Sequence, residues 1–203
     1  LLGRGIDNAP AVVQHLGLLL AMFGSVAAER SGHLTTLGGG GLGVDGRRWR
    51  IAASRLSTAG AALVCGMLAL ASWQLVDSER QAARELAYGL PIWWIQAAMP
   101  VGFLWLGARL GGRTLAKARG LRAWHSLLGL VLPSLGFWLA WQFEGSPAPL
   151  GLAMAALLLA LMAGSPIFAV LGGLALALFW HAGQPLASVA LSHYQITVNP
   201  SLP

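Results

Sequence analysis

Residues 56–76 read LSTAGAALVCGMLALASWQLV, a run that contains no Asp, Glu, Lys or Arg. An α-helix rises 1.5 Å per residue, so roughly 20 apolar residues are enough to cross about 30 Å of hydrocarbon. The stretch therefore predicts a transmembrane helix, and the rest of the chain can be tested for more of them.

Further apolar runs lie on both sides of this stretch. From residue 145 to residue 203 no acidic or basic side chain occurs except histidine, and this segment is too long for one crossing. The sequence Gly164-Ser165-Pro166 divides its apolar part, and Pro166 suits the first turn of the later helix. We expect an all-α, polytopic helical membrane protein with about six transmembrane helices, at residues 11–28, 56–76, 89–108, 123–143, 148–163 and 167–182.

The composition supports a bilayer environment. Of the 203 residues, 56% are hydrophobic and only 10% are charged, whereas soluble domains carry about 25% charged residues. The net charge of +6 and the pI near 11.1 could indicate nucleic-acid binding, but the basic residues are scattered between apolar runs and form no single face. We therefore expect the lipid bilayer, and no nucleic acid, as a partner.

The basic residues predict the orientation of the spans. Short loops rich in Lys and Arg stay in the cytoplasm, whereas residues 77–88 mix charges and residues 144–150 carry no Lys or Arg. We expect a multi-pass protein of the bacterial inner membrane, with residue 1 outside the cytoplasm and a further span before it. The loops expected in the cytoplasm carry Arg30, Arg47, Arg48, Arg50 and Arg55, and then Arg109, Arg113, Lys117, Arg119 and Arg122.

Residues 77–88 are expected to form a short helix of their own. Asp77 or Ser78 can cap its N-terminus, and Glu79 lies where the helix dipole is positive. We expect this helix to lie along the membrane surface. Trp73, Trp93 and other tryptophans near span ends are expected to anchor the spans at the headgroups.

Motifs for soluble chemistry are weak in this chain. Residues 41–46 match G-x-G-x-x-G, but no strand precedes them and Arg47-Arg48 follows, so a glycine-rich cytoplasmic loop is the better interpretation. Cys65 is the single cysteine and lies in an apolar run, which indicates a small packed side chain and neither a disulfide nor a metal site.

Polar side chains inside the predicted spans are few. His15 and Gln96 need partners in lipid and can bond across helices, which contributes about 0.6 to 2 kcal/mol. A membrane-embedded enzyme, such as an intramembrane protease or a lipid-modifying protein, is the alternative function, and it would require His15, Gln96 and Ser165 to converge in one cavity. We assign no catalytic and no metal-binding residues, and the sequence does not identify substrate-binding ones. The glycine pairs Gly107/Gly111 and Gly129/Gly136 permit close helix approach.

The order of segments resembles a known transporter family. Residues 23–30 read FGSVAAER and are followed by His33-Leu34, which is similar to the second helix and following cytoplasmic turn of the small, DctQ-type membrane subunit of tripartite ATP-independent periplasmic (TRAP) transporters. Residues 89–93 (GLPIW) and 99–102 (MPVG) resemble the last helix of that subunit. The resemblance places Arg30, His33, Arg47 and Arg48 at the cytoplasmic boundary, in a structural role.

The later part of the chain resembles the start of the large, DctM-type subunit. Residues 164–168 (GSPIF) match a recurring Gly-x-Pro-Ile between its first two helices, and residues 199–203 (NPSLP) resemble the lead into its next membrane segment. The resemblance implies a fused protein: residues 1–122 form the small-subunit region without its first helix, 123–146 the linking helix and 147–203 the start of the large subunit. The remainder of the large subunit is expected to follow.

Function follows from this resemblance and not from composition. It implies a membrane component, not an enzyme, that takes up an organic acid such as a dicarboxylate by sodium-coupled secondary transport. The expected partners are a periplasmic substrate-binding protein and the rest of the large subunit. No cofactor is expected, and the family's sodium sites are expected outside residues 1–203. The small-subunit region is expected to act as a scaffold.

Overall fold

The computed structural model describes residues 9–31, 47–119, 129–144 and 149–197. These residues contain no β-strand beyond one isolated bridge between Glu85 and Pro91, so the all-α prediction is confirmed for them. The helices are α1 (Ala9–Arg30), α2 (Arg47–Ala82), α3 (Ile92–Gln96), α4 (Ala98–Arg119), α6 (Val131–Phe143), α7 (Leu150–Met162), α8 (Ile167–His181) and α9 (Ala187–Thr197).

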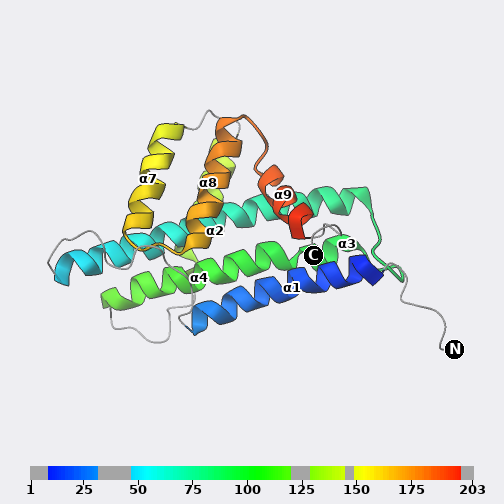
Figure 1. Cartoon of the computed structure of the whole chain (residues 1–203), viewed down its shortest axis with the longest axis horizontal. Helices are drawn as coiled ribbons and strands as arrows, with labels where there is room; N and C mark the ends of the chain where they lie inside the picture. The colour runs from blue at the N-terminus through cyan, green and yellow to red at the C-terminus, as the bar shows by residue number, and fades with distance from the viewer. Residues whose placement is uncertain (1–8, 32–46, 120–128, 145–148, 198–203) are drawn as a thin grey trace.

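Helix α2 is the centre of the arrangement. It runs antiparallel to α1 and α4, which lie along it as one elongated layer, while α7 and α8 rise steeply from that layer (Figure 1). The most extensive packing is between α2 and α4 and between α2 and α6. Helix α9 turns back from the far end of α8 and packs on α2.

Glycines allow the backbones of α2, α4 and α6 to approach closely. A Cβ on Gly66 would lie 1.9 Å from the Pro133 carbonyl oxygen, and one on Gly136 would lie 2.1 Å from the Leu63 carbonyl oxygen. A Cβ on Gly111 would lie 2.3 Å from the carbonyl oxygen of Gly129. The close approach expected for the glycine pairs is therefore confirmed, and it is made between these three helices.

The membrane spans are confirmed in part. Two helical segments, Ala9–Arg30 and Ile51–Ala82, are long and apolar enough to cross a membrane. Helices α7 and α8 have 13 and 15 residues, and at 1.5 Å per residue they measure about 20 Å, less than the hydrocarbon core of about 30 Å. The total of six crossings stays a prediction.

The separate surface helix expected at residues 77–88 is wrong. Residues 77–82 contain neither Gly nor Pro and simply continue α2. The chain leaves the helix at Ala83, whose φ of 48° is left-handed, and the Ile92 amide then donates to the Arg84 carbonyl at 3.0 Å. The span expected at residues 89–108 starts later, at Ile92, is divided at Ala97 into α3 and α4, and continues to Arg119.

The break between α7 and α8 lies where the sequence predicts it. Gly164, with a φ of 83°, ends α7: its amide donates to the Leu161 carbonyl, and the Ser165 amide donates to that of Ala160. This pattern is the Schellman motif, whose left-handed residue favours glycine. Pro166 then occupies the N-cap position of α8, which begins at Ile167. Helix α9 was not expected from the sequence.

Candidate functional site

The most deeply buried charge in the described residues is Glu29, at the end of α1. Its carboxylate is fully shielded from solvent and is paired with the Nε atoms of Arg109 and of Arg113, the latter at 2.8 Å. Nη2 of Arg113 also donates to the Glu29 carbonyl oxygen at 2.7 Å. Positions 109 and 113 are one turn apart on α4, so both guanidinium groups face the same point on α1. We call these three residues the charged clasp.

The charged clasp lies at the end of the bundle where the predicted cytoplasmic residues gather. The Thr58 and Thr114 hydroxyls are 2.8 Å apart and hold the first third of α2 beside the last turns of α4. The C-terminal ends of α1 and α4 and the N-terminal end of α2, all of which carry arginines, therefore lie at the same end of the layer (Figure 1). Most of the basic residues expected in the two loops lie in helices instead, with Arg47, Arg48, Arg50 and Arg55 in α2 and Arg109, Arg113, Lys117 and Arg119 in α4. Their placement on one side of the membrane stays a prediction.

The opposite end of the layer carries mixed charges. Glu79, almost fully buried, pairs with Arg84, and the Arg80 guanidinium lies 5.7 Å from the centre of the Trp93 ring. The Gln74 amide donates to the carboxylate of Glu144 at 2.7 Å. These contacts tie the end of α2 to the turn before α3 and to the end of α6.

A polar contact joins α1 to α9. His15 Nδ1 lies 2.7 Å from the Ala11 carbonyl oxygen, which can only accept, so Nδ1 carries the proton. Nε2 then accepts from the Tyr194 hydroxyl, also at 2.7 Å. The fully buried Gln96 amide lies beside the same hydroxyl, although it makes no hydrogen bond of ordinary geometry with the described residues. The helix-to-helix bond expected for His15 is therefore present.

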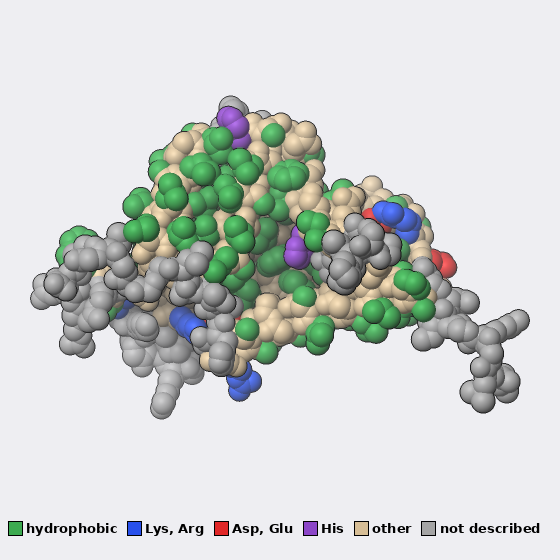
Figure 2. All heavy atoms as spheres, in the orientation of Figure 1, with side chains coloured by type: hydrophobic (Ala, Val, Ile, Leu, Met, Phe, Trp, Pro, Cys, Tyr) green, Lys and Arg blue, Asp and Glu red, His purple; other side chains and the backbone are tan. Residues whose placement is uncertain are grey.

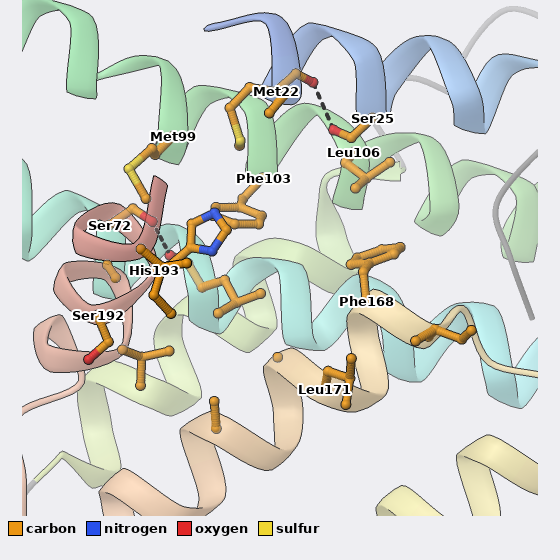
Figure 3. A pocket seen from close by; sticks show the side chains of 18 of the residues that line it. Met22, Ser25, Ser72, Met99, Phe103, Leu106, Phe168, Leu171, Ser192 and His193 are labelled. Atoms are coloured by element: carbon orange, nitrogen blue, oxygen red, sulfur yellow. Dashed lines mark hydrogen bonds between the residues drawn. The ribbon is translucent and has the colours of Figure 1, made fainter. Parts of the chain in front are cut away.

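An apolar groove lies between the α1–α2–α4 layer and the α8–α9 pair. Its volume is about 830 Å³. Figure 3 shows Met22, Met99 and Phe103 on one side and Phe168 and Leu171 on another. The imidazole of His193 points into it from α9. The hydroxyls of Ser25 and Ser72 donate instead to helix carbonyl oxygens, each at 2.7 Å, so the walls are chiefly hydrocarbon.

The residues that an embedded enzyme would need are not brought together. His15 and Gln96 share Tyr194 as a neighbour, but the Ser165 hydroxyl donates to the Ser57 carbonyl at the other end of α2, at 3.2 Å. No group of three or more His, Cys, Asp or Glu side chains suited to a metal ion occurs in the described part of the chain. Cys65 is buried, as expected.

The remaining predicted positions lie at the ends of helices. Arg30 is the exposed last residue of α1, and Arg47 and Arg48 lie in the first turn of α2. His33 and the glycine-rich residues 41–46 lie outside the described residues.

Sequence reasoning missed the charged clasp and the contact of His15 with Tyr194. The signal for the first was available: Glu29 is the sole acid in residues 8–44, and it directly follows an apolar run. The partner of His15 carried no such signal, because Tyr194 lies 179 residues away, on a helix that was not expected.

These features define the class of protein. Hydrophobic side chains cover most of the face formed by α7 and α8, and charged side chains gather toward the two ends of the layer (Figure 2). Two helical segments are long enough to cross a bilayer. These features are typical of a helical membrane protein, and here the layered helices are fixed to each other by polar contacts near both ends.

The family is given by comparison with known proteins. Residues 2–120 match the family of tripartite ATP-independent periplasmic transporters, DctQ component. The match covers more than half of the chain, which therefore belongs to this family and is a membrane component of a TRAP transporter. The DctQ-type resemblance is thus confirmed for these residues. No curated protein and no solved structure matched the chain.

Proposed function

We propose that this chain is part of a TRAP transporter that takes up an organic acid, a dicarboxylate or related carboxylate, by sodium-coupled secondary transport. A soluble periplasmic binding protein delivers the substrate to the membrane subunits. The observation that carries the proposal is the family match over residues 2–120, which covers the whole α1–α2–α4 layer. Substrate class, sodium coupling and the binding protein come from the family resemblance.

Within that transporter, the α1–α2–α4 layer acts as a scaffold. Interlocked helices suit this role because close-packed cores have few alternative arrangements and transmit strain. The glycine contacts with α6 and the charged clasp support it, since both fix one helix against another. The substrate and the sodium ions then bind to the large subunit, outside residues 1–203.

The chain is also proposed to be a fusion of two subunits. In this proposal residues 1–122 are the small-subunit region, 123–146 the linking helix and 147–203 the start of a DctM-type large subunit. The sequence GSPIF at the α7–α8 break supports the last assignment. The packing of α8 and α9 on α2 supports a permanent connection between the two regions.

The transport proposal is tested in proteoliposomes that contain the full-length membrane protein. Uptake of labelled dicarboxylates and related acids is measured with and without the periplasmic binding protein, and with an inward gradient of Na⁺ or of K⁺. We expect accumulation of at least one acid only with both the binding protein and Na⁺. Uptake of these acids that is equal in Na⁺ and K⁺, or independent of the binding protein, would overturn the proposal.

The inner-membrane orientation is tested by cysteine labelling of intact cells. In a Cys65→Ala background, Arg47→Cys and Lys117→Cys should both be protected from a membrane-impermeant maleimide, whereas Glu85→Cys should react. The exposure of the Glu85 side chain makes it a suitable control. Labelling of only one of positions 47 and 117 would contradict the shared cytoplasmic side.

A further inference from the structure

Gln96 carries a buried amide whose hydrogen-bonding groups are unused in the described part of the chain. The residue is completely shielded from solvent, and neither its Oε1 nor its Nε2 atom makes a hydrogen bond of ordinary geometry there. In folded proteins the large majority of buried polar side-chain atoms have a partner, which is either another protein group or an ordered water molecule. An unused acceptor and an unused donor on one buried side chain therefore point to a bound molecule.

The amide reaches from α3 toward the contact between α1 and α9. Gln96 is the last residue of α3 and lies beside the Tyr194 hydroxyl of α9. That hydroxyl donates its single hydrogen to Nε2 of His15 on α1, so its oxygen can only accept from Gln96. A side-chain amide has two N–H donors and one oxygen acceptor. Tyr194 can serve one N–H, which leaves the second N–H and Oε1 for another partner.

The break between α3 and α4 provides a further acceptor. In a regular helix the carbonyl of residue 96 would accept from the amide of residue 100. That residue is Pro100, which has no N–H. The helix is divided at Ala97, immediately after this carbonyl. Gln96 therefore offers two oxygens, one on the side chain and one on the backbone, to a molecule that can donate.

The unused groups select the chemical class of this molecule, which must donate to Oε1 and accept from the second N–H. A cation would bind Oε1 but leave the N–H without a partner, and an anion would do the reverse. Glu79 and Arg84 act electrostatically on the Tyr194 hydroxyl in opposite directions, so neither sign of charge is favoured. Water both donates and accepts, and a buried water typically makes about three hydrogen bonds.

We propose that Gln96 binds one buried water molecule. The water accepts from the second N–H of the amide, and it donates to Oε1 and to the carbonyl oxygen that Pro100 leaves without its helical partner. It completes a polar connection from the α3–α4 break through Gln96 and Tyr194 to His15, and so helps to hold α9 on the α1–α2–α4 layer. Bridging waters of this kind are nearly as favourable in enthalpy as direct hydrogen bonds.

The first test is a structure of the full-length membrane protein in lipid nanodiscs, at a resolution that shows ordered water, determined in sodium and in potassium buffer. In both buffers we expect one density peak at about 2.5 to 3.0 Å from Gln96 Oε1. A peak that occurs in sodium buffer alone would identify a cation. Hydrogen bonds from protein groups to Oε1, with no such peak, would show that the protein satisfies the amide by itself. Either of these two results would overturn the proposal.

A pair of variants measures what the bound water contributes. Gln96→Met removes the amide and keeps an unbranched side chain. Hydrogen bonds between membrane helices change an equilibrium constant about threefold each, and this substitution removes at least two bonds, so the equilibrium constant for SDS-induced unfolding should rise about tenfold. The matched control Gln142→Met, at an exposed residue of α6, should change it by no more than about twofold. A fall in this constant for Gln96→Met would mean that the amide has no partner at all, and would contradict the proposal.

The same substitution in a Tyr194→Phe background separates the water from the contact with Tyr194. The water bonds to Oε1 and to the backbone, so its contribution should remain when the hydroxyl is removed. We expect Gln96→Met to raise the equilibrium constant for unfolding at least about threefold in this background. No change would mean that Gln96 acts through Tyr194 alone, and it would overturn the proposal even if the density does not resolve water.

Discussion

The α2–α4–α6 contact and helix α7 use similar amino acids in opposite ways. In the first region glycines bring backbones into contact, and side chains such as Leu106 and Leu110 are almost completely buried. In the second, α7 contains no buried residue, and large side chains such as Leu152 and Leu159 are exposed. Hydropathy alone would rank α7 as a core helix, so apolar content does not indicate which helices pack against protein.

The difference lies in shape and polarity. Lipid tails are as apolar as leucine, so helices in a bilayer associate through close packing and polar contacts and not through hydrophobicity. Helices α2, α4 and α6 have glycines at the contact, and α1 and α4 have the charged clasp. Helix α7 has Gly151, but a Cβ there would meet nothing within 4 Å. It therefore presents its surface to lipid or to further protein.

The largest effect is expected from adding one methyl group at Gly66. In Gly66→Ala the new Cβ would lie 1.9 Å from the Pro133 carbonyl oxygen and 2.9 Å from the Phe137 nitrogen. Only a backbone shift can relieve these contacts, so the free energy of unfolding should fall by about 3 kcal/mol. SDS-induced unfolding in mixed micelles measures it.

The matched control for this change is Gly151→Ala in α7. With open space around Gly151 and a helical backbone, alanine should leave stability unchanged or raise it by about 0.5 to 1 kcal/mol. Equal destabilisation by the two substitutions would remove the distinction between the two regions.

The next largest effect is expected at the charged clasp. Glu29→Gln removes the carboxylate that both Arg109 and Arg113 face. Because these arginines are partly exposed and can regain water, we expect a loss of about 2 kcal/mol, below the 3 to 5 kcal/mol of a fully buried pair. Glu85→Gln, at an exposed position, should change stability by less than about 0.5 kcal/mol. If Glu85→Gln lowered the free energy of unfolding as much as Glu29→Gln, the stabilising role of the charged clasp would be contradicted.

The sequence predicted some helices better than others, and the reasons are physical. The apolar runs at 56–76 and 167–182 predicted α2 and α8 well, because length and hydropathy are local properties. The continuation of α2 to Ala82 was missed because capping residues such as Asp77 also occur inside helices. Helix α9 was missed because Ser188, Ser192 and His193 dilute its apolar pattern.

The candidate site was less predictable than the fold. Pairing Glu29 with Arg109 requires contact between residues 80 positions apart, and neither residue carries a signal for its partner. The groove is less predictable still, because side chains from five helices, α1, α2, α4, α8 and α9, together define it. The sequence predicted only the kinds of residue that occur in this part of the chain, which are apolar helices with arginines at their ends.

A smaller effect is expected at the contact between α1 and α9. His15 accepts from the Tyr194 hydroxyl at 2.7 Å, which links α1 to α9. Tyr194→Phe and His15→Phe, combined in a double-mutant cycle, should give a coupling energy of about 0.6 to 1 kcal/mol, typical of hydrogen bonds between membrane helices. A coupling energy of zero would mean that α9 docks on α1 and α2 through apolar contacts alone.

The smallest effect is expected on the outer surface of α7, and it sharpens the comparison most directly. Leu152 is 70% exposed, so Leu152→Ala leaves no cavity between the described helices and should lower the free energy of unfolding by less than about 0.5 kcal/mol. Leu110→Ala, at a residue that is 1% exposed, is the matched control and should cost about 2 to 5 kcal/mol. The measurement belongs in the full-length protein, since an effect at Leu152 above 2 kcal/mol would show that α7 is covered by protein there. Helix α7 would then differ from the α2–α4–α6 contact only in the protein segment against which it packs.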